Sequence, residues 1–419
     1  MTFLSLPKFD STANDKNYLL LLLGVVATLS GDWFAQIAFF SVILQLTGAH
    51  APIAIYFLCL FLPKLITPYL WTRLRIAFPW KSVLIFTQML GGLLTAFQIF
   101  AIVCHFNKIF YIVTFAKGFS SALVYLTYDA LMLLHLDNAV NINKANATMT
   151  LTRYGSLALF PLIGAMCAAA FGNLIAIAID GLSFVLAAII FSLVSGCFFI
   201  ETRNKQPISN SKAVSLLNAY NKLNGFLKIQ FGTVFANAIA YSFFNYLLPI
   251  YIFVQLSASK QEYGIITSLS GVVFIIGSRF LSSNLMSKIS HSLRIHLIIV
   301  FTITNGLFLY WAFNAVSILV FLIFLLAACF ASLGSIVNLK TSIFVQRPDQ
   351  RKNYVALYGI ADWGGLSLGF LFCAFWGDRI DNALLAQIIL FLLSIGPIML
   401  ALHQHVFVKI KRAKNEMAI

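Results

Sequence analysis

Charged side chains are scarce in this sequence. Its 419 residues include 13 acidic and 28 basic side chains, so that only 10% are charged while 60% are hydrophobic. A soluble globular domain has about 25% charged and about 45–50% apolar residues. The mean hydropathy is +0.91. The excess of apolar residues extends along the whole chain, which excludes an ordinary soluble domain and predicts a protein that crosses the membrane many times.

Several chemical signatures are also missing. The chain has neither a GxxxxGK[ST] loop for nucleotide phosphates nor an HExxH zinc motif. Its six cysteines do not have metal-ligand spacing and lie within or at the ends of apolar runs. The net charge of +15 does not indicate nucleic-acid binding, because the basic residues fall in alternate loops. We therefore expect no enzyme activity, no cofactor, no metal site and no nucleic-acid partner.

Long unbroken apolar runs take the place of these motifs. A transmembrane strand would alternate apolar and polar residues over about ten positions, so these runs are predicted to be helices. The polar segment 201–222 divides the chain into an N-terminal bundle, 1–200, and a C-terminal bundle, 223–419. The twelve predicted spans are 17–46, 51–71, 82–104, 109–135, 146–171, 174–200, 223–256, 262–286, 293–313, 316–340, 353–377 and 382–408.

The basic residues predict the orientation in the membrane. The two termini, the central segment and every second loop carry most of the lysine and arginine residues. The opposite loops carry only Lys108, Lys260 and Arg379. Because loops rich in Lys and Arg stay in the cytoplasm, both termini and the 201–222 loop are predicted to be cytoplasmic.

The two halves share weak internal repeats. VILQLTGA (Val42 to Ala49) resembles IFVQLSAS (Ile252 to Ser259), and RYGSLAL (Arg153 to Leu159) resembles DWGGLSL (Asp362 to Leu368). Each second copy lies about 210 residues after the first, in the matching helix of its half. The similar spacing indicates a duplication of six helices, and it places Arg153 and Asp362 at equivalent positions.

Longer stretches resemble a known family. They are FLPKLITP (Phe61 to Pro68), NKANATMTLTRYGSLALFPLIGA (Asn143 to Ala165), AIDGLSF (Ala178 to Phe184) and FNYLLPIY (Phe244 to Tyr251), together with Gly31-Asp32 in the first span. With the six-plus-six arrangement, they resemble the major facilitator superfamily, and within it the bacterial subfamily of enterobactin exporters and macrolide efflux proteins. The segment YLWTRLRIAFPWK (Tyr69 to Lys81) lacks the Gly and Asp of the superfamily's loop motif.

The resemblance implies a monomeric secondary transporter in the inner membrane of a bacterium, surrounded by lipid. It implies alternating access and a small-molecule substrate, with protons as the coupling ion. Proton-coupled export of a siderophore or similar metabolite is the first expectation. Two alternatives are efflux of macrolide-like drugs and uptake of a ferric siderophore or lipid-like nutrient.

Charges inside the predicted spans are candidate functional groups, because a charge at the bilayer centre costs at least about 2.5–3.5 kcal/mol. Asp32 lies ~22 Å into the first span, near its middle. It is either a proton-coupling or cation-binding carboxylate, or a structural acid paired with a base. Lys117 is predicted to bind an anionic substrate group or to pair with Asp32. Asp180, in the sixth span, is predicted to be structural.

Four further charges are predicted to act in gating. Asp129 is expected to form a cytoplasmic-side salt bridge with Arg153. Arg153 and Asp362, at equivalent positions with opposite charge, are expected to belong to charge networks that break and reform between states. Lys64, between two prolines, has a structural or gating role.

Aromatic and amide side chains complete the predicted pathway. The seventh span combines aromatic residues with a helix-breaking proline in YSFFNYLLPIY, Tyr241 to Tyr251. Such a surface suits a bulky, partly apolar substrate, although aromatic residues also simply face lipid. The residues predicted to line the cavity are Trp33, Tyr125, Tyr128, Asn237 and Asn245.

Overall fold

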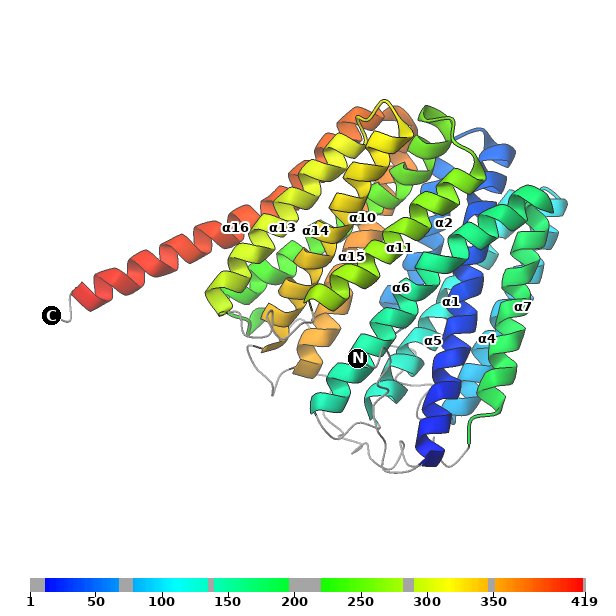
Figure 1. The fold of residues 1–419 in the computed structure, drawn as a ribbon, viewed down its shortest axis with the longest axis horizontal. Coiled ribbons are helices and arrows are strands. Elements are labelled where there is room, and N and C mark those ends of the chain that lie inside the picture. The colour runs from blue at the N-terminus through cyan, green and yellow to red at the C-terminus, as the bar shows by residue number, and fades with distance from the viewer. Residues whose placement is uncertain are drawn as a thin grey trace. The chain divides into compact units, whose positions relative to one another are not determined.

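The computed structural model describes residues 12–67, 78–134, 139–195, 220–281, 290–345 and 351–416. Within these ranges the chain is helical and contains no strand (Figure 1). The long helices of the N-terminal half are α1 (Thr12–Thr47), α2 (Ala51–Phe61), α4 (Trp80–Val103), α5 (Asn107–Leu134), α6 (Ala139–Ala170) and α7 (Asn173–Ser192). Those of the C-terminal half are α10 (Gly225–Ile250), α11 (Lys260–Leu281), α13 (His291–Ala312), α14 (Ile318–Val345), α15 (Arg351–Trp376) and α16 (Asn382–Glu416).

Eleven helices in the described part of the chain are long and apolar enough to cross a membrane. The remaining predicted span, the second, is represented by the shorter apolar helix Ala51–Thr67, which has a turn at Leu62. The predicted end of this span, at 71, lies outside the described residues. An all-α membrane protein is therefore confirmed. Several helices extend beyond the apolar runs that predicted them, since α1 begins at Thr12 and α16 ends at Glu416.

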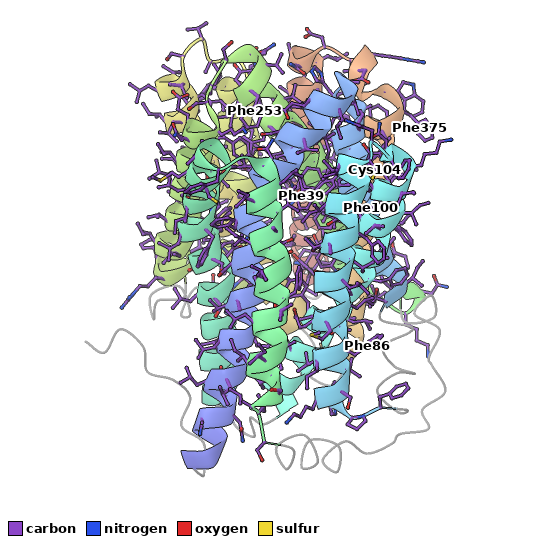
Figure 2. The ribbon with its side chains drawn as sticks, turned by 90° about the vertical axis from the view of Figure 1, so that its right-hand side faces the viewer. Phe39, Phe86, Phe100, Cys104, Phe253 and Phe375 are labelled. Carbon is purple, nitrogen blue, oxygen red and sulfur yellow. The ribbon has the colours of Figure 1, made fainter. Side chains whose placement is uncertain are left out.

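The outward faces of these helices are apolar. Figure 2 labels Phe86 and Phe100 on α4, whose side chains are 67% and 53% exposed. Exposed large apolar side chains recur on the other helices, for example Ile112 and Phe391. A soluble monomer rarely exposes such continuous apolar surface. Lipid is therefore the solvent for which this surface is suited.

The chain forms two compact units, of which unit 1 comprises Met1–Asn210 and Ala258–Ile275. In unit 1, α1 packs against α6 and α7, and α4 packs against α5 and α7 (Figure 1). Its largest buried side chains at one end form a cluster around Tyr18, Leu21, Leu84, Tyr128 and Phe191. This packing fixes α1 among helices that carry the candidate charges.

Unit 2 comprises Ser211–Ser257 and Ile276–Ile419. In it α10 packs against α15 and α16, and α13 packs against α14 and α16. These are the same helix pairings as in unit 1: the first span of each half contacts the fifth and sixth, and the third contacts the fourth and sixth. The equivalence supports the duplication predicted from the short internal repeats.

The first part of α11 belongs to unit 1, although the helix lies in the C-terminal half of the sequence. It follows α6 along a seam of small residues. A Cβ atom on Gly271 would lie 2.5 Å from the backbone nitrogen of Ala158, and one on Gly264 would lie 2.6 Å from Cβ of Ala165. The hydroxyl of Ser268 accepts a hydrogen bond of 3.1 Å from the backbone N–H of Leu162. Small residues of this kind let membrane helices approach closely.

The α10 helix changes its winding near its end. Pro249 has no backbone N–H, and five residues of π-helix, Tyr251–Gln255, follow Ile250. A proline removes a helical hydrogen bond, and a wider turn accommodates the loss. The predicted helix break at Pro249 is thus a change of helix type within a continuous element.

Candidate functional site

The Gly31-Asp32 pair brings together two structural requirements in α1. A Cβ atom on Gly31 would overlap the hydroxyl of Ser183 and lie 2.8 Å from Oδ1 of Asp180, so that only glycine allows α7 to approach here. Asp32 follows about 100° further round the helix and is partly buried. The Tyr125 hydroxyl of α5 donates a hydrogen bond of 3.4 Å to Oδ2 of Asp32. One face of α1 therefore packs, and the neighbouring face carries a carboxylate.

Tyr125 is the centre of a charged cluster. The Lys64 ammonium lies 5.9 Å from the centroid of its ring, and the guanidinium carbon of Arg153 lies 5.8 Å from it. Lys64 also lies 4.3 Å from the Phe61 ring centroid. Cations at these distances are attracted to the electron-rich face of an aromatic ring. We call Asp32, Lys64, Tyr125 and Arg153 the Tyr125 cluster; four separate helical segments contribute to it.

A second charged group lies deeper in unit 1. The Lys117 ammonium donates to Oδ2 of Asp180 at 2.5 Å, and the two side chains are 6% and 0% exposed. The rings of Phe39 and Phe184 flank the ammonium, with centroids at 5.4 and 5.0 Å. Lys117 is thus paired with Asp180 rather than with Asp32. The second carboxylate oxygen of Asp180, Oδ1, has no hydrogen-bond partner among the described atoms.

The two groups interact through space. Asp32 is within electrostatic range of Asp180, Lys117 and Lys64. At a given distance, a Coulomb interaction is stronger in a low-dielectric interior than in water. A change of charge on Asp32 therefore alters the energy of the whole group.

The other predicted site residues lie elsewhere. Tyr128 is 1% exposed and belongs to the core cluster of unit 1, while Trp33 is partly buried on α1. Asn237 is 6% exposed on α10, and its Oδ1 has no hydrogen-bond partner among the described atoms. Asn245 donates to the backbone oxygen of Tyr241, one turn earlier in the same helix. The Asp129 side chain lies outside the described residues.

Arg153 and Asp362 occupy matching helices of the two halves. Arg153 is on α6 in unit 1 and Asp362 is on α15 in unit 2, and both α6 and α15 pack against the first helix of their half. Their proposed gating role stays a prediction, as does that of Lys64.

Unit 2 contains a neutral polar network that the sequence did not single out. The Asn305 amide donates to the Tyr241 hydroxyl at 3.4 Å, and that hydroxyl hydrogen-bonds Ser332. Thr302 and Ser335 share a hydrogen bond of 2.5 Å between their hydroxyls. Isolated Ser, Thr and Asn residues in apolar runs were the available signal. Such residues also bond their own helix, so only the fold shows which of them meet.

The described residues contain no group of three or more His, Cys, Asp or Glu side chains that could hold a metal ion.

The helix order and packing define a membrane protein with the major facilitator fold. No family model and no curated protein sequence matches the chain. Solved structures do match its fold. A bacterial homologue of the iron transporter ferroportin, in an inward-facing state, is 14% identical with a TM-score of 0.70, covering 94% of this chain and 99% of that one.

Two other transporters give similar values. The POT family transporter PepTSo is 11% identical with a TM-score of 0.69, over 93% of this chain and 98% of its own. A variant of the nucleoside transporter NupG is 13% identical with a TM-score of 0.71, over 92% and 98%. At identities this low, the matches show a shared fold alone. The substrates in the names of these transporters are those of the named proteins.

Proposed function

We propose that this protein is a secondary active transporter that moves a small organic solute by alternating access and couples transport to protons at Asp32. The observation that carries the proposal is the different environment of two intramembrane acids. Lys117 neutralises Asp180 in a buried ion pair. Asp32 accepts its described hydrogen bond from a neutral hydroxyl, in a partly buried position. Asp32 is therefore the acid better placed to gain and lose a proton during transport.

The structural matches support the coarser part of the proposal. An iron transporter homologue, a POT family transporter and a nucleoside transporter share the fold over more than nine-tenths of this chain. A shared fold alone does not define a substrate. The polytopic architecture and the intramembrane charges, taken with these matches, favour a solute pathway over a scaffold.

The finer proposal is export of a siderophore or similar metabolite by proton antiport. It rests on the resemblance of Gly31-Asp32 and the longer stretches to the enterobactin-exporter and macrolide-efflux subfamily. We further propose a monomer in the inner membrane of a bacterium, with both termini in the cytoplasm. This orientation is supported by the basic residues of alternate loops.

The first test compares an iron-starved deletion strain with its parent by mass spectrometry of medium and cells. Export predicts less siderophore in the medium and accumulation of the metal-free compound in the cells. Normal secretion together with failure to take up the labelled ferric complex would reverse the direction. If neither changes, the siderophore proposal is wrong, and a drug-susceptibility panel tests the efflux alternative.

Site variants then test the coupling. Asp32→Asn in the complemented strain is expected to abolish net transport driven by a pH gradient, because the amide cannot carry a proton. Asp381→Asn is the matched control, since it removes an exposed acid between α15 and α16 outside the spans. Equal activity of Asp32→Asn and wild type, at equal expression, would remove Asp32 from the coupling mechanism.

A further inference from the structure

A groove separate from the Tyr125 cluster opens at one end of unit 1. Its volume is about 650 Å³, within the range of small-molecule sites, about 300–1,000 Å³. The last turn of α1, the last turn of α4 and the connection from α6 to α7 form its walls. The lining residues used below are Gln45, Val103, His105, Phe171, Asn173 and Ile175.

Two tight turns shape this groove. The α4–α5 turn contains His105 with φ 56°, and the α6–α7 turn contains Gly172 with φ 92°. Left-handed residues reverse the chain in few residues, so α5 begins at Asn107 and α7 begins at Asn173. Cys104, next to two lining residues, marks this end of α4 in Figure 2, whereas Phe86 lies towards the other end. The groove is thus at the level where three membrane-spanning helices end.

The walls and the rim of the groove differ in chemistry. Phe171, Ile175 and Val103 are 68%, 47% and 57% exposed and form an apolar wall on the lipid-facing surface. Gln45, His105 and Asn173 are polar. Val103 and Ile175 lie within helices, whereas His105 lies in the α4–α5 turn and Asn173 is the first residue of α7. Apolar and polar groups that meet at helix ends match the boundary between acyl chains and headgroups.

A basic side chain lies beside the groove. The Lys260 ammonium donates a hydrogen bond of 2.7 Å to Oδ1 of Asn173, which positions the charge beside the groove. Lys108 directly follows Asn107, a lining residue of the adjoining smaller pocket. The sequence has only three basic residues in the loops on this side, Lys108, Lys260 and Arg379. Of these, Lys260 is the one whose ammonium is bonded to a lining residue of the groove.

We propose that this groove binds an anionic phospholipid of the adjacent leaflet. The headgroup phosphate is held by Lys260, Asn173 and His105, and one acyl chain lies along Phe171, Ile175 and Val103. A lysine ammonium is a common partner for phosphate, because the hydrogen bond between them is charge-assisted. The groove lies away from Asp32. Lipid binding to it can therefore be measured without transport of a solute.

Native mass spectrometry of the purified protein tests the proposal with phosphatidylglycerol and phosphatidylcholine of identical acyl chains. Wild type is expected to bind one phosphatidylglycerol in preference to phosphatidylcholine. Lys260→Gln is expected to weaken phosphatidylglycerol binding roughly tenfold, because one charged hydrogen bond is lost. Arg379→Gln makes the same charge change at an exposed turn of unit 2 and is expected to leave binding unchanged.

A second variant and a soluble competitor separate the alternatives. Ile175→Trp fills the groove and is expected to weaken binding of both lipids, with thermal unfolding confirming that each variant is folded. Glycerol 3-phosphate, which has the phosphate without acyl chains, is expected not to compete. Equal binding of the two lipids by wild type, unchanged binding by both variants, or displacement by glycerol 3-phosphate would each overturn the lipid site.

Discussion

The buried pair of Lys117 and Asp180 has side chains that are 6% and 0% exposed. Removing one partner of a buried pair leaves an uncompensated charge, which destabilises proteins by about 3–5 kcal/mol. We therefore expect Asp180→Asn to lower the unfolding temperature of the detergent-solubilised protein markedly. Replacing both residues, as Lys117→Met with Asp180→Leu, is expected to restore most of the stability. The measurement is thermal unfolding of the three proteins.

This double replacement also distinguishes a structural pair from a transport residue. If the double variant is stable and transports as wild type does, the pair only supports the fold. A stable double variant without transport would show that the pair takes part in transport. A single Asp180→Asn variant as stable as wild type would contradict the predicted cost of an unpaired lysine.

The aromatic ring of Tyr125 is predicted to matter more than its hydroxyl for holding Lys64 and Arg153. Both cations lie within 6 Å of the ring centroid, where each interaction is worth about 0.5–2 kcal/mol. Tyr125→Phe keeps the ring and is expected to retain most transport activity, whereas Tyr125→Leu is expected to lose most of it. Initial transport rates at matched expression check this order, and equal rates for the two variants would show that the ring is not needed.

The sequence indicates the intramembrane charges but not their partners. Asp32 was identifiable because a lone carboxylate in an apolar helix is costly. Lys117 and Asp180, by contrast, are 63 positions apart, and nothing in either local stretch indicates the other. The place of Asp180 in its span predicts a structural role, but its direct contact with Lys117 depends on how α5 and α7 pack. Ion pairs between distant helices require the tertiary structure.

At the scale of whole helices, two glycines of α6 offer a matched comparison. A Cβ atom on Gly164 would overlap the backbone carbonyl of Phe34 in α1, whereas one on Gly155 would meet nothing within 4 Å. Backbone cannot yield as a flexible side chain does, so Gly164→Ala is expected to separate α1 from α6 and cost about 1–3 kcal/mol. Gly155→Ala is expected to be neutral or stabilising by about 0.5–1 kcal/mol, because alanine favours helix.

Thermal unfolding of the two alanine variants checks this prediction. Both variants make the same change, glycine to alanine, in the same helix, so they differ only in what surrounds the added methyl group. Equal stability of both variants would show that α1 and α6 are not in the close contact described. The site gives a second readout: displacement of α1 moves Asp32, so Gly164→Ala is expected to reduce transport as well.

The position of each helix in the sequence was predictable because hydropathy reports burial in lipid directly. The apolar runs predicted twelve spans, and the described helices follow most of them, with extensions at ends such as those of α1 and α16. The sixth span was predicted too long, since α7 ends at Ser192 rather than near 200. The association of α11 with unit 1 was not predictable in the same way. It depends on the contact of small residues such as Gly264 and Gly271 with α6. A small residue in an apolar run does not indicate which helix it will contact.

On the scale of the whole molecule, the two halves repeat the same four helix pairings with little shared sequence. Membrane helices need apolar outer faces and small or complementary contacts, and many sequences meet these conditions. The short repeats around Val42 and Arg153 are what a duplication leaves once most positions have diverged. The charges diverged further: unit 1 carries the Tyr125 cluster, while the corresponding interior of unit 2 holds the neutral network of Tyr241, Asn305 and Ser332.

The predicted orientation in the membrane is testable. The α4–α5 turn and the central segment of the sequence are predicted to lie on opposite sides of the membrane. Starting from a cysteine-free variant, Lys108→Cys and Lys222→Cys each introduce one thiol at an exposed position. With cytoplasmic termini, a membrane-impermeant maleimide is expected to label Lys108→Cys in intact spheroplasts and Lys222→Cys only after the membrane is opened. The reverse labelling pattern would show that the predicted orientation in the membrane is wrong. It would also assign the lipid groove to the cytoplasmic leaflet, because Lys108, in the first turn of α5, closely follows His105 of the groove.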